Sequence, residues 1–173
     1  MSVAVLLLLA VPAGAAAVEG GEGILGRDGV VGPNVVNGVP VTVQVGVSRE
    51  PDVVAFAGSP TSAEDIEVEG GTPARLLLYR CGRFCATRYY FEPASGLLGV
   101  VSTTSRRFAT AAGTAVGMSR AAAIRLEGRR PRQACGDGTE IVTGRSLYTI
   151  VGIDGRRVVG LALTSPDVGI GLC

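Results

Sequence analysis

The sequence predicts an α+β protein made of two tandem units, each a short helix packed on an antiparallel sheet. Three observations carry this prediction. A five-residue motif occurs twice, a short apolar helical pattern follows each copy, and alternating strand patterns follow each helix. The chain has 173 residues, of which 47% are hydrophobic and 18% charged. That is enough for one ordinary domain, or two small ones, with a packed core.

The repeated motif sets the boundaries of the two units. Its first copy is Val45-Gly46-Val47-Ser48-Arg49 and its second is Val116-Gly117-Met118-Ser119-Arg120. Each copy is followed by an apolar stretch, a glycine and a proline, in the same order and at matching spacing. Duplication explains this agreement better than chance does in a chain rich in Gly and Val. We place unit one at residues 40–105 and unit two at residues 106–173, after an N-terminal extended segment at residues 18–39.

A short helix is expected after each motif copy. Ser48 and Ser119 stand where an N-cap belongs, since a hydroxyl there accepts a hydrogen bond from an unpaired N–H of the first turn. Gly58 and Gly128 are expected to end the helices as left-handed caps. Helices of about eight or nine residues are marginal alone, so each needs a sheet to pack on.

Strand patterns follow both helices. The first unit is expected to form a hairpin with the loop Gly82-Arg83-Phe84, and the second a hairpin around Asp154-Gly155. The expected strands are residues 76–80, 86–91 and 97–102 in unit one, and residues 141–142, 146–151 and 158–163 in unit two.

The first 17 residues are predicted to be a signal peptide. Residues 3–18 are apolar or small, with four leucines at the centre, and Ala15-Ala16-Ala17 supplies the small residues of a cleavage site. The run is shorter than the roughly 18 apolar residues of a membrane-spanning helix. A buried N-terminal strand or helix is the alternative. The first cysteine is Cys81, so we expect no lipid anchor at the cleavage site, no membrane anchor after cleavage, and a secreted protein, extracellular or periplasmic.

Export would give the four cysteines a structural meaning, because an oxidising compartment favours two disulfides. The cysteines are Cys81, Cys85, Cys135 and Cys173. Of the three possible pairings we favour Cys81–Cys85, which would close the first hairpin, together with Cys135–Cys173. A four-cysteine zinc site and a redox-active centre are the alternatives. The C-x3-C spacing followed by two isolated cysteines is typical of neither.

The element that runs from a strand through Val-Gly-Met-Ser-Arg into a helix and a glycine resembles two known families. It is similar to the repeat of the secreted β-lactamase inhibitory proteins and to the small SmpA/OmlA (BamE-like) envelope proteins. The resemblance implies a short helix that opens at a Gly-Met-Ser-Arg turn and packs on an antiparallel sheet, and two units in tandem is the inhibitor family's layout. The chain also resembles secreted proteins of high-GC bacteria. The inhibitors' aromatic-rich surface and the BamE-like lipid anchor have no counterpart here, so the resemblance implies a fold and no target.

Missing residue types exclude several chemistries. All 16 basic residues are arginine, and the sequence contains no lysine, histidine or tryptophan. Ser-His-Asp and Cys-His catalysis, histidine metal sites, Schiff-base lysines and phosphate loops with a lysine are therefore excluded. We expect no cofactor and no metal.

One acidic stretch, residues 64–69, is the candidate for other chemistry. Asp65, Glu67 and Glu69 would lie on one side of an extended segment, where they could bind Ca²⁺ or supply a carboxylate pair for glycoside hydrolysis. Their alternation with Ile66 and Val68 fits a solvated strand face equally well.

Charge and aromatic residues point to the cysteine hairpin as a contact surface. Up to Pro73 the chain has nine acidic residues and two arginines, whereas from Arg75 onward it has fourteen arginines and six acidic residues. Tyrosine and arginine are enriched at binding hot spots. The predicted surface consists of Tyr79, Arg80, Arg83, Phe84, Arg88 and Tyr90.

The sequence therefore predicts an exported, disulfide-stabilised, non-enzymatic binding protein. Its partner would be an unknown protein or an anionic envelope polymer, and export argues against nucleic acid. The alternative is a hydrolase that uses carboxylates alone, such as a glycosidase.

Overall fold

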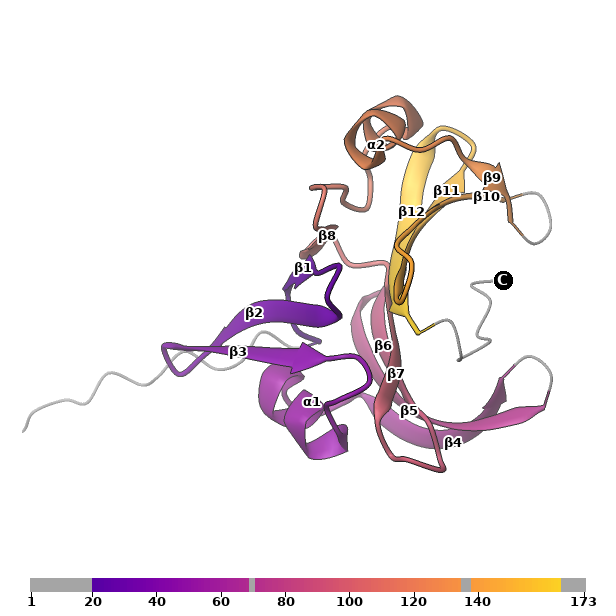
Figure 1. Cartoon of the computed structure of the whole chain (residues 1–173). Helices are drawn as coiled ribbons and strands as arrows, with labels where there is room; N and C mark the ends of the chain where they lie inside the picture. Colours follow the sequence, from indigo (N-terminus) through magenta and orange to yellow (C-terminus); the bar gives the residue numbers. More distant parts are fainter. Residues whose placement is uncertain (1–19, 69–70, 135–137, 166–173) are drawn as a thin grey trace, which may run out of the picture.

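A computed structural model describes residues 20–68, 71–134 and 138–165 (Figure 1). Over these residues the chain is mostly β, with 12 strands in two sheets and two short helices. The predicted α+β class is therefore wrong. Each helix has only eight residues, and the segment before the first helix, which had no assigned sheet, forms strands of its own.

The smaller sheet has four strands in the order β3-β2-β1-β8. These are β1 (Gly23–Leu25), β2 (Val30–Val36), β3 (Val39–Gln44) and β8 (Phe108–Thr110). Asn37 and Gly38 join β2 to β3 with positive φ angles of 51° and 79°, as a two-residue hairpin turn requires. β8 comes from far along the chain and pairs with β1 in parallel, so the predicted second unit contributes a strand to a sheet that the N-terminal residues begin.

The larger sheet has eight strands in the order β4-β5-β6-β7-β12-β11-β10-β9. It consists of two antiparallel meanders whose last strands, β7 and β12, pair with each other. Figure 1 shows that the whole sheet curves strongly. The strands of the first meander are β4 (Ser62–Val68), β5 (Thr72–Gly82), β6 (Cys85–Phe91) and β7 (Leu98–Thr103). Those of the second are β9 (Arg132–Gln133), β10 (Thr139–Thr143), β11 (Tyr148–Asp154) and β12 (Arg157–Thr164).

The two motif copies make matching contacts with the last strand of each meander. The Gly46 N–H donates to the carbonyl of Leu98 in β7 at 2.7 Å, and the Gly117 N–H donates to the carbonyl of Val158 in β12 at 2.8 Å. The Leu98 N–H in turn donates to the carbonyl of Ser48 at 2.8 Å, and the Val158 N–H donates to the carbonyl of Met118 at 2.9 Å, which is one motif position earlier. Both glycines have a positive φ, which favours glycine at this position. Duplication and the unit boundaries stay predictions that this correspondence supports.

Helix α1 (Glu50–Ala57) begins differently from the prediction. Its N-cap is Arg49, whose N–H donates to the Asp52 carboxylate at 2.8 Å. The predicted cap Ser48 lies one residue earlier, and its hydroxyl accepts the N–H of Gln44 at 2.9 Å instead. The helix ends at Gly58, whose φ of 79° and ψ of −164° are outside the left-handed helical region predicted for it.

Helix α2 (Arg120–Glu127) begins at Ser119, whose hydroxyl accepts the N–H of Ala122 at 3.2 Å. It ends at Gly128 in the left-handed conformation, with φ 64° and ψ 21°. Neither helix in the described part of the chain has the length and apolarity needed to span a membrane.

One core lies between the two sheets and includes α1. Phe56 of α1 is fully buried, and its carbonyl accepts the side-chain amide of Asn34 in β2 at 2.5 Å. On the other side, the hydroxyl of Tyr79 in β5 donates to the carbonyl of Gly58 at 2.9 Å. The helix is therefore bonded to both sheets, and it does not simply cover the sheet that follows it in sequence.

The burial of Phe56 predicts a large stability cost for its removal. We expect Phe56→Ala to lower the free energy of unfolding by about 3–5 kcal/mol, because it deletes a ring enclosed between two sheets. The matched control is Phe84→Ala, at a side chain that is 83% exposed, which should change stability by less than about 0.5 kcal/mol. Urea unfolding measures both, and equal effects would contradict the burial described here.

Candidate functional site

The hairpin of β5 and β6 carries the disulfide predicted between Cys81 and Cys85, which is confirmed with a Cα–Cα distance of 5.0 Å. The loop is one residue shorter than predicted, because Gly82 pairs with Cys85 and leaves only Arg83 and Phe84 at the tip. Between Arg80 and Gly82 the register shifts, so the strand bulges beside the bridge. Bonded to each other, these two cysteines are not zinc ligands. Cys135 and Cys173 lie outside the described residues.

Tyr79 does not belong to the binding surface predicted for it. The side chain is 1% exposed and its ring meets that of Tyr89 edge-on at 5.5 Å between centroids. Successive residues of a strand face opposite sides of a sheet, and Tyr79 is on the side that faces the core. Burial, with the charge of Glu50 adding, raises the pKa of Tyr79 to about 12. Burial also raises the pKa of Tyr89 well above its usual value.

The other five predicted residues divide between the opposite face and the tip. Arg80, Arg88 and Tyr90 lie on the sheet face opposite Tyr79; Arg80 is exposed and the other two are half-buried. Arg83 and Phe84 form the tip, where the Arg83 guanidinium lies 5.1 Å from the centre of the Phe84 ring. An arginine over an aromatic face is a cation–π contact, which contributes about 0.5–1 kcal/mol at an exposed site.

A groove of ≈ 460 Å³ lies beside the tip. It is lined by Cys81, Phe84, Cys85, Thr104, Ser105, Arg106, Arg107 and Val116. No acidic side chain is among these residues, so the groove is basic and partly apolar. Sequence reasoning missed Arg106 and Arg107, although they directly follow the hydroxyl-rich end of β7.

Thr104 fixes the hairpin to this groove. Its hydroxyl accepts the N–H of Ala86 at 2.9 Å and donates to the carbonyl of Phe84 at 3.1 Å. The tip is thus held by a covalent bridge on one side and by hydrogen bonds to the neighbouring segment on the other. We call Arg83, Phe84 and Arg106, with the disulfide between them, the tip surface.

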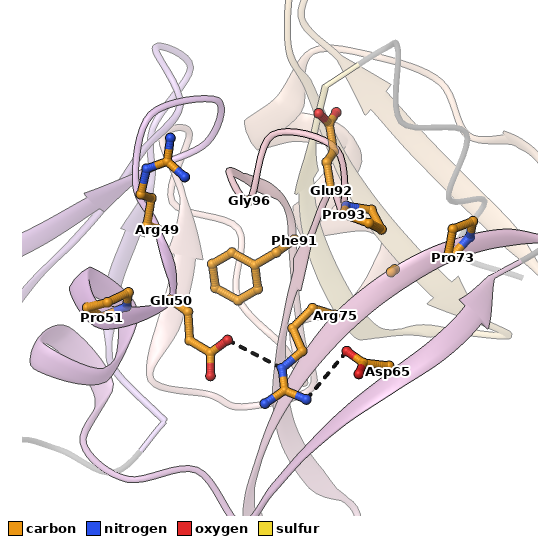
Figure 2. A pocket seen from close by; sticks show the side chains of 11 residues that line it. Arg49, Glu50, Pro51, Asp65, Pro73, Arg75, Phe91, Glu92, Pro93 and Gly96 are labelled. Carbon is orange, nitrogen blue, oxygen red and sulfur yellow. Dashed lines mark hydrogen bonds and ion pairs between the residues drawn. The ribbon is translucent and has the colours of Figure 1, made fainter.

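A second hollow, of ≈ 500 Å³, lies between the start of α1, strands β4 and β5, and the turn after β6 (Figure 2). Arg75 lies between two carboxylates in it, with Nε 3.3 Å from Glu50 Oε2 and Nη1 3.5 Å from Asp65 Oδ1. The hydrogen bond with Glu50 raises the pKa of Arg75 from its usual value. Glu92 points away from this pair and accepts the Ser95 hydroxyl at 3.0 Å.

The acidic stretch occupies β4, at the edge of the large sheet. Asp65 and Glu67 are exposed on it, and Glu69 lies outside the described residues. Asp65 is already engaged by Arg75. Over residues 20–68, 71–134 and 138–165, no group of three Cys, Asp or Glu side chains is placed to hold a metal ion.

The chain matches no protein-family profile and no curated protein. It is similar in fold to the crystal structure of an extracellular protein containing an SCP domain from Bacillus anthracis str. Ames, with a TM-score of 0.53 and 6% sequence identity. The similarity covers 69% of this chain and 44% of that one, so this chain spans under half the length of the solved protein. At this identity the likeness shows the fold alone.

Removing the hairpin bridge should destabilise the protein modestly. We expect Cys81→Ser/Cys85→Ser to lower the free energy of unfolding by about 2 kcal/mol, because the bridge closes only a short loop and the entropy it removes from the unfolded chain is small. Urea unfolding of the double variant checks this. A cost above about 5 kcal/mol would show that the bridge holds more than the hairpin.

Stability should fall at alkaline pH. A tyrosine whose pKa is raised by folding ionises first in the unfolded chain, so the stability that Tyr79 contributes is complete below pH 10 and is lost as the pH rises toward 12. We expect Tyr79 to account for a loss of about 2 kcal/mol by pH 11.5, and the raised pKa of Tyr89 to add to this loss. Urea unfolding between pH 8 and pH 11.5 measures it. Tyr79→Phe should remove about 2 kcal/mol of the loss at pH 11.5, and an unchanged pH dependence would contradict this origin.

Proposed function

We propose that the chain is an exported, non-enzymatic binding protein whose tip surface docks into an acidic protein partner. The observation that carries the proposal is Phe84, which is 83% exposed at the end of a hairpin closed by a disulfide. An exposed aromatic ring on a rigid support gains free energy when a partner covers it, and little conformational entropy is lost because the support is already ordered.

Charge around Phe84 supports an acidic partner. Arg83 stacks on the ring, and Arg106 and Arg107 line the adjoining groove. Guanidinium groups pair with carboxylates in a two-pronged geometry and are frequent in binding hot spots. We choose a protein over an anionic envelope polymer because the most exposed group is an apolar ring, which a polymer of charged groups would leave uncovered.

Export has three supports. The apolar leader predicted at residues 1–17 lies outside the described residues, but its pattern is that of a signal peptide. A structural disulfide is typical of oxidising compartments. The solved protein of similar fold is described as extracellular.

The resemblance to the two-unit inhibitor family stays a proposal about ancestry. It is supported by the two meanders that join into one sheet and by the matching bonds of Gly46 and Gly117. Neither observation identifies a target.

The alternative is a hydrolase using carboxylates alone, for which the second hollow offers Glu50 and Asp65, since Glu92 points away from them. An acid–base pair requires two carboxyl groups in different environments, one of them protonated. Here both accept bonds from the same permanently charged guanidinium, that of Arg75. This arrangement favours a structural ion-pair network, and we therefore prefer the binding protein.

Affinity capture from culture medium and cell envelope, with the purified protein as bait, tests the proposal. We expect Arg83→Ala/Phe84→Ala to reduce recovery of a specific acidic protein at least tenfold, since a hot spot of this kind contributes more than about 1.4 kcal/mol. The control is Arg125→Ala/Val159→Ala, which removes an exposed arginine and an exposed apolar side chain elsewhere. Equal recovery with both variants, or recovery of a polymer in place of a protein, would contradict the proposal.

A further inference from the structure

A third hollow, of ≈ 310 Å³, gathers arginines from three distant parts of the chain. It is lined by Arg27, Glu127, Arg129, Thr143, Gly144 and Arg145. Arg27 lies in the turn between β1 and β2, Arg129 follows α2, and Arg145 lies in the turn between β10 and β11. No local sequence pattern indicates that these three residues lie together.

The two turns that carry Arg27 and Arg145 are in close contact. The side chain of Leu147 lies against Gly29, since a Cβ built on Gly29 would be 2.7 Å from the Leu147 Cδ1, and the φ of 88° at residue 29 favours glycine. This contact brings the turn that carries Arg27 and the turn that carries Arg145 together at the hollow.

The hollow has an excess of positive charge. Its one carboxylate, Glu127, is only 8% exposed and accepts the hydroxyl of Thr110 at 2.5 Å. Between residues that the structure describes, the ion pairs involve Arg75 and Arg132, and none joins Arg27, Arg129 or Arg145 to a carboxylate. Three guanidinium groups and one carboxylate leave a net charge of +2 around the hollow.

Such an arrangement suits a small dianion. All three arginines are exposed, and like charges that line one hollow repel each other, so a bound anion relieves the repulsion. Guanidinium groups bind phosphoryl oxygens in pairs with fixed geometry. A phosphate monoester carries about −1.5 to −2 charges at pH 7, which matches the excess.

We propose that this hollow binds a phosphate monoester of a small polyol or sugar. The volume is at the lower end of ligand pockets, roughly 300–1,000 Å³, and so fits a small phosphorylated group. The phosphoryl group contacts the three arginines, and the Glu127 carboxylate accepts a hydroxyl of the same ligand. This site is distinct from the tip surface and does not depend on the function proposed for it.

Isothermal titration calorimetry of the full-length protein with glycerol 3-phosphate, at low and at moderate salt, tests the site. We expect saturable binding that Arg129→Gln and Arg145→Gln each weaken at least tenfold. The matched control is Arg130→Gln, at the exposed neighbour of Arg129 that does not line the hollow, and it should bind as the wild type does. Unchanged urea midpoints would show that the variants remain folded.

Two further experiments test the role of Glu127 and distinguish a soluble phosphate ester from a lipid headgroup as the ligand. Glu127→Gln keeps an acceptor for Thr110 but removes a negative charge, so it should bind inorganic phosphate more tightly and lose part of the preference for glycerol 3-phosphate. If vesicles containing phosphatidic acid bind while the soluble ester does not, and Arg129→Gln abolishes that binding, the phosphoryl group at this site belongs to a lipid headgroup. Absence of saturable binding to either ligand, or equal weakening by Arg129→Gln and Arg130→Gln, would overturn the proposal.

Discussion

The antiparallel pairing of β7 with β12 is the interaction on which the rest of the fold depends. It joins two four-stranded meanders into one sheet through pairs such as Leu163 with Val101 and Ala162 with Ser102. All six residues of β7 are buried, as are the last four of β12, so this seam lies at the centre of the molecule. Without it each meander would expose the backbone groups of a long apolar strand. The smaller sheet and α1 then cover the face that the joined meanders present.

Local features of the fold were predictable from the sequence, and non-local ones were not. The Cys81–Cys85 hairpin was found because strand alternation, a short loop and two cysteines are signals contained in a few residues. The predicted length of the hairpin loop was wrong because a bulge changes the strand register without changing the sequence pattern. The parallel pairing of β1 with β8 brings together residues far apart in the chain, and no local pattern indicates it. Asn37-Gly38 was a hairpin signal that was present but not used.

In the candidate sites, too, local features were predictable from the sequence and contacts between distant segments were not. Clustering of tyrosine and arginine led to the prediction of a binding surface at the hairpin, but clustering does not say which face of a strand a residue takes. Tyr79 therefore proved to be a core residue, with its hydroxyl bonded to Gly58, whereas Arg80 next to it is exposed. Arg27, Arg129 and Arg145 belong to segments that meet only because two sheets pack together. The sequence predicts that arginines as a class lie on the surface. It does not distinguish an isolated surface arginine from one that lines a hollow together with other arginines.

The acidic residues of β4 affect self-association of the protein. Among the strands that the structure describes, β4 ends the large sheet and pairs only with β5, which leaves a row of backbone donors and acceptors open to another chain's strand. Glu64, Asp65 and Glu67 are exposed along it, so a second β4 brought alongside would place carboxylates against carboxylates. At the opposite end β9 has only two residues, too few to template a ribbon. Over the described residues, both edges of the large sheet therefore disfavour strand pairing with a second copy, which opposes growth of the sheet into a filament.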